Sequence, residues 1–129
     1  MTSIRRMGDG YEPHVDDVGG RLIYSLPVDS SIATSDFSFD ITPKDLAILL
    51  DDSYRRAMLA VIAHTVLQRS MIRGNPPVDQ DEFDGLVSSV LRSSDDDLEA
   101  FADGIDREHN IRVRIYVEQE LTRRRAQGI

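Results

Sequence analysis

The chain contains no cysteine among its 129 residues. Disulfide bonds, thiolate metal sites, iron–sulfur clusters and a cysteine nucleophile are therefore excluded. No apolar run approaches the roughly 18 residues of a membrane span, and the first residues lack the apolar core of a signal peptide. We therefore expect a cytoplasmic protein that does not enter a membrane.

Sequence motifs of the common enzyme classes are also missing. The chain has no GxSxG, HExxH, P-loop or GxGxxG pattern. Its histidines, His14, His64 and His109, lie far apart in sequence, and the acidic run that follows His14 has no further ligands nearby. His64 would serve as a base only if it lined a pocket with an acid, whereas a core position is the more common place for such a residue. The sequence predicts no enzyme, no cofactor and no metal site.

Length and composition indicate one globular domain. With 129 residues, the chain is long enough to bury a core without cross-links. Its 40% hydrophobic and 29% charged residues are typical of a globular protein. We expect a helix-dominated α+β domain with a few short β-strands over residues 21–129. Residues 1–20 contain four glycines and few large apolar side chains, which predicts a flexible N-terminal arm.

Three segments suggest strands. Residues 21–26 are mostly apolar and end at a proline. Residues 36–41 alternate between apolar and polar side chains, which is the pattern of a half-buried strand. Residues 111–117 alternate in the same way, and we favour a strand there. A helix in this segment, capped by Asn110, is the alternative that the pattern leaves open.

The central helix is expected over residues 53–73. Its middle is apolar on nearly every face, which is typical of a helix surrounded by other elements. A shorter helix before it should begin at Thr42, with Pro43 in its first turn, and end near Asp51.

Two further helices carry clear start signals. Asp79 and Glu82 stand in the spacing of a capping box ahead of an apolar stripe within residues 78–91. Ser94 begins the next helix in the same way and is followed directly by three aspartates.

Charge is distributed unevenly along the chain. The net charge is −8. Residues 79–106 contain ten acids and one base, a balance of −9, whereas residues 107–129 contain six arginines and three glutamates, a balance of +3. Acids that cap helices and keep a protein soluble account for part of this pattern.

The remaining acids predict a docking surface for a basic protein partner. Nucleic acid is not expected as a partner, because the same carboxylates would repel phosphates. The predicted partner-binding residues are Asp79, Asp81, Glu82, Asp84, Asp95, Asp96, Asp97, Glu99 and Asp103.

This acidic stretch, together with the missing active-site motifs, resembles the small acidic immunity proteins of bacterial toxin systems. The resemblance is one of profile and carries no matching motif. It implies a noncatalytic cytoplasmic protein that neutralises a basic, nuclease-type toxin through an acidic helical surface.

An alternative hypothesis is a self-assembling scaffold or regulatory subunit. The acidic middle of one copy would then meet the basic tail of another and form a homo-oligomer. The tail arginines are Arg112, Arg114, Arg123, Arg124 and Arg125.

Overall fold

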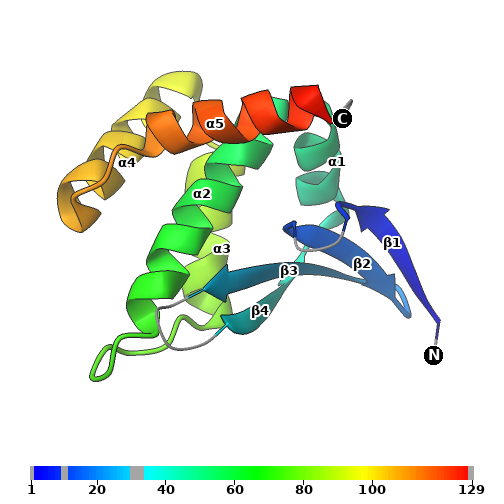
Figure 1. Ribbon diagram of the computed structural model, residues 1–129. Coiled ribbons are helices and arrows are strands. Elements are labelled where there is room, and N and C mark those ends of the chain that lie inside the picture. The colour runs from blue at the N-terminus through cyan, green and yellow to red at the C-terminus, as the bar shows by residue number, and fades with distance from the viewer. Residues whose placement is uncertain (1, 10–11, 30–33, 128–129) are drawn as a thin grey trace.

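A computed structural model describes residues 2–9, 12–29 and 34–127. The described residues form an antiparallel sheet of four strands in the order β1-β2-β3-β4, followed by five helices (Figure 1). The expected helix-dominated α+β domain is therefore confirmed. The strands are β1 (Ser3–Met7), β2 (His14–Val18), β3 (Arg21–Asp29) and β4 (Thr34–Ile41). The helices are α1 (Pro43–Asp51), α2 (Ser53–Ser70), α3 (Gln80–Leu91), α4 (Asp95–His109) and α5 (Val113–Ala126).

One face of the sheet is apolar because the buried side chains alternate along β3 and at the end of β4. In β3 these are Tyr24, Leu26 and Val28, and in β4 they include Phe39 and Ile41. Helix α2 packs against β3, and α3 packs against β4. The apolar face of the sheet is thereby covered by two helices, and this layer is the core of the domain.

Three aromatic rings join the sheet to α3. Phe83 is fully buried and stacks on Phe39 with ring centroids 4.3 Å apart. The ring of Tyr24 also packs on Phe83, with centroids 5.6 Å apart and the rings tilted. Aromatic pairs of this kind stabilise a core beyond the area they bury.

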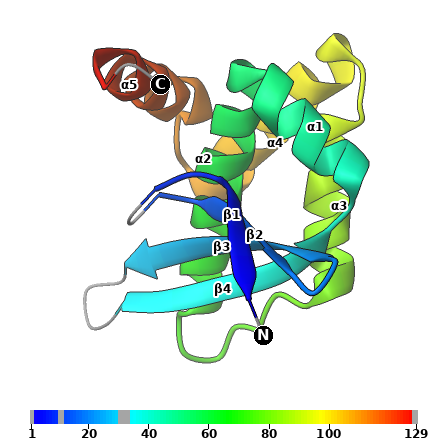
Figure 2. The same cartoon turned by 90° about the vertical axis from the view of Figure 1, so that its right-hand side faces the viewer.

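Helix α2 occupies the centre of the helical layer, as its apolar sequence predicts. It contacts α1, α3 and α5 as well as the sheet, and α5 crosses it at the upper end in Figure 1. The view in Figure 2 shows α1, α2 and α3 side by side, with α5 set apart from α3. The helix ends at Ser70, three residues before the predicted end, and a turn leads to Gly74.

The predicted helix starts are confirmed. Thr42 forms a complete capping box with Asp45 at the start of α1. Asp79 accepts a hydrogen bond from the backbone of Glu82 at the start of α3, and Ser94 accepts one from Asp97 at the start of α4. The 36–41 strand is also confirmed, as the greater part of β4.

The 21–26 strand is confirmed but extends to Asp29. Its proline does not end it because β2 pairs with β3 only as far as Ser25. Among the described strands, Pro27 therefore lies on a stretch of β3 that pairs with β4 alone, and it has no N–H to leave unpaired on the open side.

The predicted flexible arm is wrong for the described residues between 1 and 20. These residues contain β1 and β2, and Met7 and Val15 reach the core. Cross-strand ion pairs join Arg5 to Asp16 and Arg6 to Asp17. The apolar pattern is too short to indicate the hairpin, because most side chains of β1 and β2 lie outside the core.

The predicted strand at 111–117 is also wrong, because Val113 begins α5. Asn110 adopts a left-handed conformation and ends α4 rather than capping a new helix. The first N–H of α5 is satisfied instead by the Asp106 carboxylate, 2.7 Å from the nitrogen of Val113. Val113 and Val117 are buried, whereas Ile115 between them is 49% exposed. The spacing of Val113 and Val117 fits both structures, because positions i and i+4 share a face in helices as well as in strands.

Candidate protein-binding surface

The predicted acidic residues do not form one continuous surface. Asp79, Asp81, Glu82 and Asp84 lie at the beginning of α3, whereas the others lie on α4, which starts just beyond the far end of α3. Helix α3 has 12 residues, which is a length of about 18 Å. The acidic stretch is therefore divided into two groups at opposite ends of this helix.

The group at the start of α3 is partly used within the fold. Asp79 caps the helix. Asp84 accepts a hydrogen bond from Gln80, whose amide also bonds the backbone of Asp40 in β4. Within the described part of the chain, only Asp81 and Glu82 of this group have carboxylates without an ion pair or a hydrogen bond.

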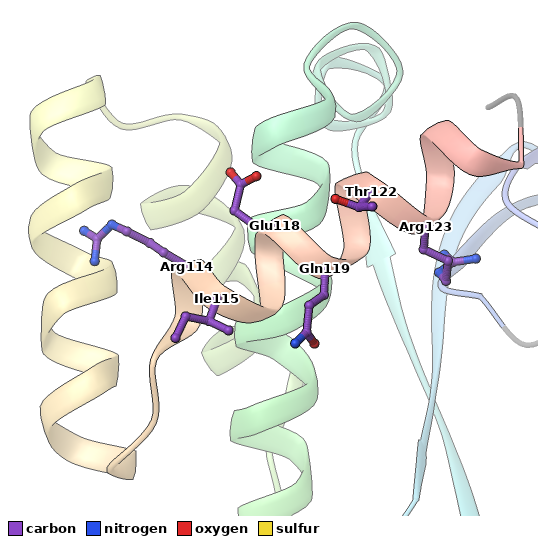
Figure 3. A pocket seen from close by; sticks show the side chains of 6 residues that line it. All are labelled: Arg114, Ile115, Glu118, Gln119, Thr122 and Arg123. Carbon is purple, nitrogen blue, oxygen red and sulfur yellow. The ribbon is translucent and has the colours of Figure 1, made fainter.

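Arg114 on α5 neutralises the side of α4 that faces it. Its guanidinium lies 3.0 Å from Glu99, 3.0 Å from Asp103 and 3.7 Å from Asp106. In Figure 3 its side chain extends from α5 toward α4. Glu99 and Asp103 are therefore engaged within the molecule. The sequence conceals this relief because Arg114 follows Glu99 by 15 residues.

The beginning of α4 lies against the beginning of α2. Arg55 of α2 is only 8% exposed, donates to the Val90 carbonyl and pairs with both Asp52 and Asp95. Tyr54 donates to Glu99 at 2.6 Å. Burial and this hydrogen bond raise the pKa of Tyr54 to about 12, so the phenol remains a donor.

These contacts bring five aspartates to one end of the molecule, here named the acidic end. Asp51 and Asp52 were not among the predicted binding residues, because in sequence they read only as the junction between two helices. The positive charge of Arg55 lies beneath this surface, whereas the Asp95 side chain is 99% exposed. The members of the acidic end are Asp51, Asp52, Asp95, Asp96 and Asp97.

The carboxylates of the acidic end are available to a partner. Within the described residues, Asp51, Asp96 and Asp97 have no side-chain ion pair or hydrogen bond, and all three are exposed. Two helix N-termini, those of α2 and α4, also point to this end. Their dipoles partly offset the mutual repulsion of the carboxylates, which keeps the aspartates compatible with the fold.

A second exposed feature is the outer side of α5. Ile115 is 49% exposed and Tyr116 is 52% exposed. A shallow depression runs along this side past Glu118, Gln119 and Thr122 (Figure 3). It presents apolar surface beside polar side chains.

His64 is half-buried on α2. Burial lowers its pKa, and the charge of Asp29 offsets part of that shift. The cavities that border α5 do not include His64 in their linings. The hypothesis of a histidine-based enzyme therefore gains no support from these cavities.

No protein-family model, no curated protein and no solved structure matches the chain. Among the residues that the structure describes, none of the helices combines the length and the apolar composition needed to cross a bilayer. The proposed function therefore rests on the geometry and charge of the described residues.

Proposed function

We propose that this is a noncatalytic cytoplasmic protein that binds a basic protein partner through its acidic end. The observation that carries the proposal is the convergence of five aspartates from the α1–α2 junction and the start of α4. Among the described residues, the cation paired with them is Arg55, which is buried beneath them. A partner of the nuclease-toxin kind, as bacterial immunity proteins bind, would supply the matching arginines and lysines.

The mechanism would be steric and electrostatic. Carboxylates on the acidic end would attract a basic surface over a distance and then accept hydrogen bonds from its guanidinium and ammonium groups. Occupying the residues with which a nuclease holds phosphates would block its substrate site. Pairs that become desolvated would contribute most of the affinity, whereas charges at the rim would mainly raise the association rate.

The test uses matched triple variants. In Asp95→Asn/Asp96→Asn/Asp97→Asn, three charges are lost from the acidic end while Ser94 still caps α4. The control Asp81→Asn/Glu82→Gln/Asp84→Asn removes three charges from the other end of α3. Both variants lose the same formal charge, so a difference between them reports position rather than net charge.

We expect the wild type and the control variant to retain a basic partner that the 95–97 variant loses. With the purified partner, the 95–97 variant should bind at least tenfold more weakly, or about 1.4 kcal/mol. Its association rate should also depend less on salt. Equal affinities for all three proteins would contradict the proposal.

The self-assembly alternative requires arginines of the basic tail that are free to meet another copy, and the structure leaves fewer of them free than the sequence suggests. Arg114 pairs with acids of α4, Arg123 pairs with Glu12 and Glu120, and Arg124 is buried. Light scattering at about 50 mM and about 500 mM salt separates the two hypotheses. An oligomer that dissociates at the higher salt would favour self-assembly, and a monomer at both would favour a different protein as partner.

A further inference from the structure

A cavity of about 290 Å³ lies between α1, α2 and α5, and Leu50 and Ser53 of its lining directly flank Asp51 and Asp52 of the acidic end. Leu49 and Leu50 of α1 and Leu121 of α5 supply apolar wall. Leu50 is 54% exposed although it is a large apolar residue. The cavity is near the lower end of the size range of small-molecule sites, about 300–1,000 Å³.

Three arginines line the same cavity. Arg56 comes from α2, and Arg124 and Arg125 come from α5. Arg124 is only 8% exposed, and its buried Nε atom has no hydrogen-bond partner. Within the described residues, no carboxylate lies in ion-pair distance of any of the three. A guanidinium that is buried without an anion is uncommon, because it loses water without gaining a partner.

The nearest carboxylates are held by a fourth arginine. Glu12 and Glu120 border the inner side of Arg56 and Arg124. Both pair with Arg123, at 3.0 Å and 2.6 Å. Neither therefore neutralises the cations of the cavity at close range.

The electrostatics of Arg56 agree with this geometry. Burial lowers its pKa, and the charge of Arg124 lowers it further. The charges of Glu12 and Glu120 act in the opposite direction without reversing the shift. An anion in the cavity would offset both the cost of desolvating the buried Arg124 guanidinium and the repulsion between the guanidinium groups of Arg56 and Arg124.

We propose that the cavity lined by Arg56, Arg124 and Arg125 binds a small phosphate monoester with an apolar substituent. Guanidinium groups match the oxygen geometry of both phosphate and carboxylate. Three of them favour the group with more charge, and a phosphate monoester carries about −1.5 to −2 at pH 7. The leucine walls would take the apolar substituent. The limited volume favours a free small molecule over a lipid headgroup in a bilayer.

Titration calorimetry with three probes tests the proposal. Phenyl phosphate should bind the wild type more tightly than inorganic phosphate, and benzoate should bind most weakly. In a ¹H–¹⁵N spectrum, the Arg124 Nε–H resonance should shift on addition of phenyl phosphate. The absence of saturable binding at millimolar phenyl phosphate would overturn the proposal, and so would equal binding of benzoate.

Variants assign the binding to the cavity. Arg124→Met removes the guanidinium but keeps a flexible chain as long as the aliphatic stem, and it should weaken phenyl phosphate binding at least tenfold. Arg125→Gln changes an exposed residue that should not affect folding, and it should weaken binding severalfold. Arg107→Gln, an exposed arginine on α4, is the control. Unchanged binding in both cavity variants would overturn the assignment.

The source of the phosphate is tested separately. Sedimentation with vesicles that contain phosphatidic acid should leave the protein in solution. Capture by these vesicles without binding of phenyl phosphate would overturn the proposal of a free small ligand. Residues 95–97 do not line this cavity, so the 95–97 variant should bind phenyl phosphate like the wild type.

Discussion

Replacing Arg92 by methionine should destabilise the protein more than removing its partner, Asp45. Asp45 is 1% exposed and accepts hydrogen bonds from the Thr42 backbone at 3.0 Å and from two Arg92 nitrogens at 3.0 and 2.9 Å. The Arg92 side chain is 45% exposed. The two partners therefore differ in how well water can replace the lost contact.

The magnitudes follow from this difference. In Arg92→Met the Asp45 carboxylate stays buried with one remaining backbone donor, and leaving a buried charge unpaired costs about 3–5 kcal/mol. We expect about 3 kcal/mol, the lower end of that range, because the pair opens to solvent on one side. In Asp45→Ala the guanidinium can turn into water, so the lost cap and ion pair should cost about 1–2 kcal/mol.

Urea unfolding followed by circular dichroism measures the free energy of unfolding of both variants. In thermal unfolding, the Arg92→Met change should lower the melting temperature by about 10 °C for a chain of this size. The double variant should be no less stable than Arg92→Met, because the unpaired carboxylate is then absent. A loss of less than about 1 kcal/mol in Arg92→Met, or a larger loss in Asp45→Ala, would refute the reasoning.

The same pair predicts a pH dependence. Burial alone would raise the pKa of Asp45, but the hydrogen bonds from Arg92 and Thr42 outweigh it and lower the pKa below its usual value. The pair therefore stabilises the wild type above the unfolded-state pKa of about 3.9, and this contribution disappears as the pH falls through the lower folded-state value. Without Arg92, burial should raise the pKa of Asp45, so the stability gap between wild type and Arg92→Met should begin to narrow above about pH 4, as the pH falls through that raised value, and should narrow further below about pH 4 as the wild type loses its ion pair.

Two further predictions concern the core and the first hairpin. Phe83→Ala should cost about 3–5 kcal/mol in urea unfolding, because it removes a fully buried ring that packs on Phe39 and Tyr24; a cost below about 1 kcal/mol would contradict this packing. Gly8→Ala should cost about 2 kcal/mol, since Gly8 has a φ of +85° and a methyl group there would overlap the Pro13 carbonyl. Gly85→Ala is its control in open space on α3, and it should instead stabilise by about 0.5–1 kcal/mol; the same sign in both variants would refute the argument for Gly8.

Local signals in the sequence predicted the elements that they directly specify. Thr42, Asp79 and Ser94 are N-caps because a side-chain oxygen can satisfy a helix N–H over three residues, without help from the rest of the fold. The alternation in β4 and the apolar middle of α2 likewise report burial directly. These features need only short-range information.

The errors concern features that tertiary contacts decide. The Val113–Val117 spacing fits a strand and a helix equally well, and the Asp106 carboxylate that satisfies the first N–H of α5 comes from the end of another helix. The acidic surface was predicted as one patch because the path of α3 is not visible in sequence. Likewise, the charge relief by Arg114 depends on the packing of α5 against α4.

The position of α5 has a consequence for synthesis of the chain. The apolar helix α2 is complete at Ser70, but the helix that covers its upper end is not complete until Ala126. At about 5–20 residues per second, a growing chain spends roughly 3–11 s with that side of α2 uncovered. Chains that stop within α5 never cover it, and they should accumulate as aggregates or as substrates of proteolysis rather than as shortened folded protein.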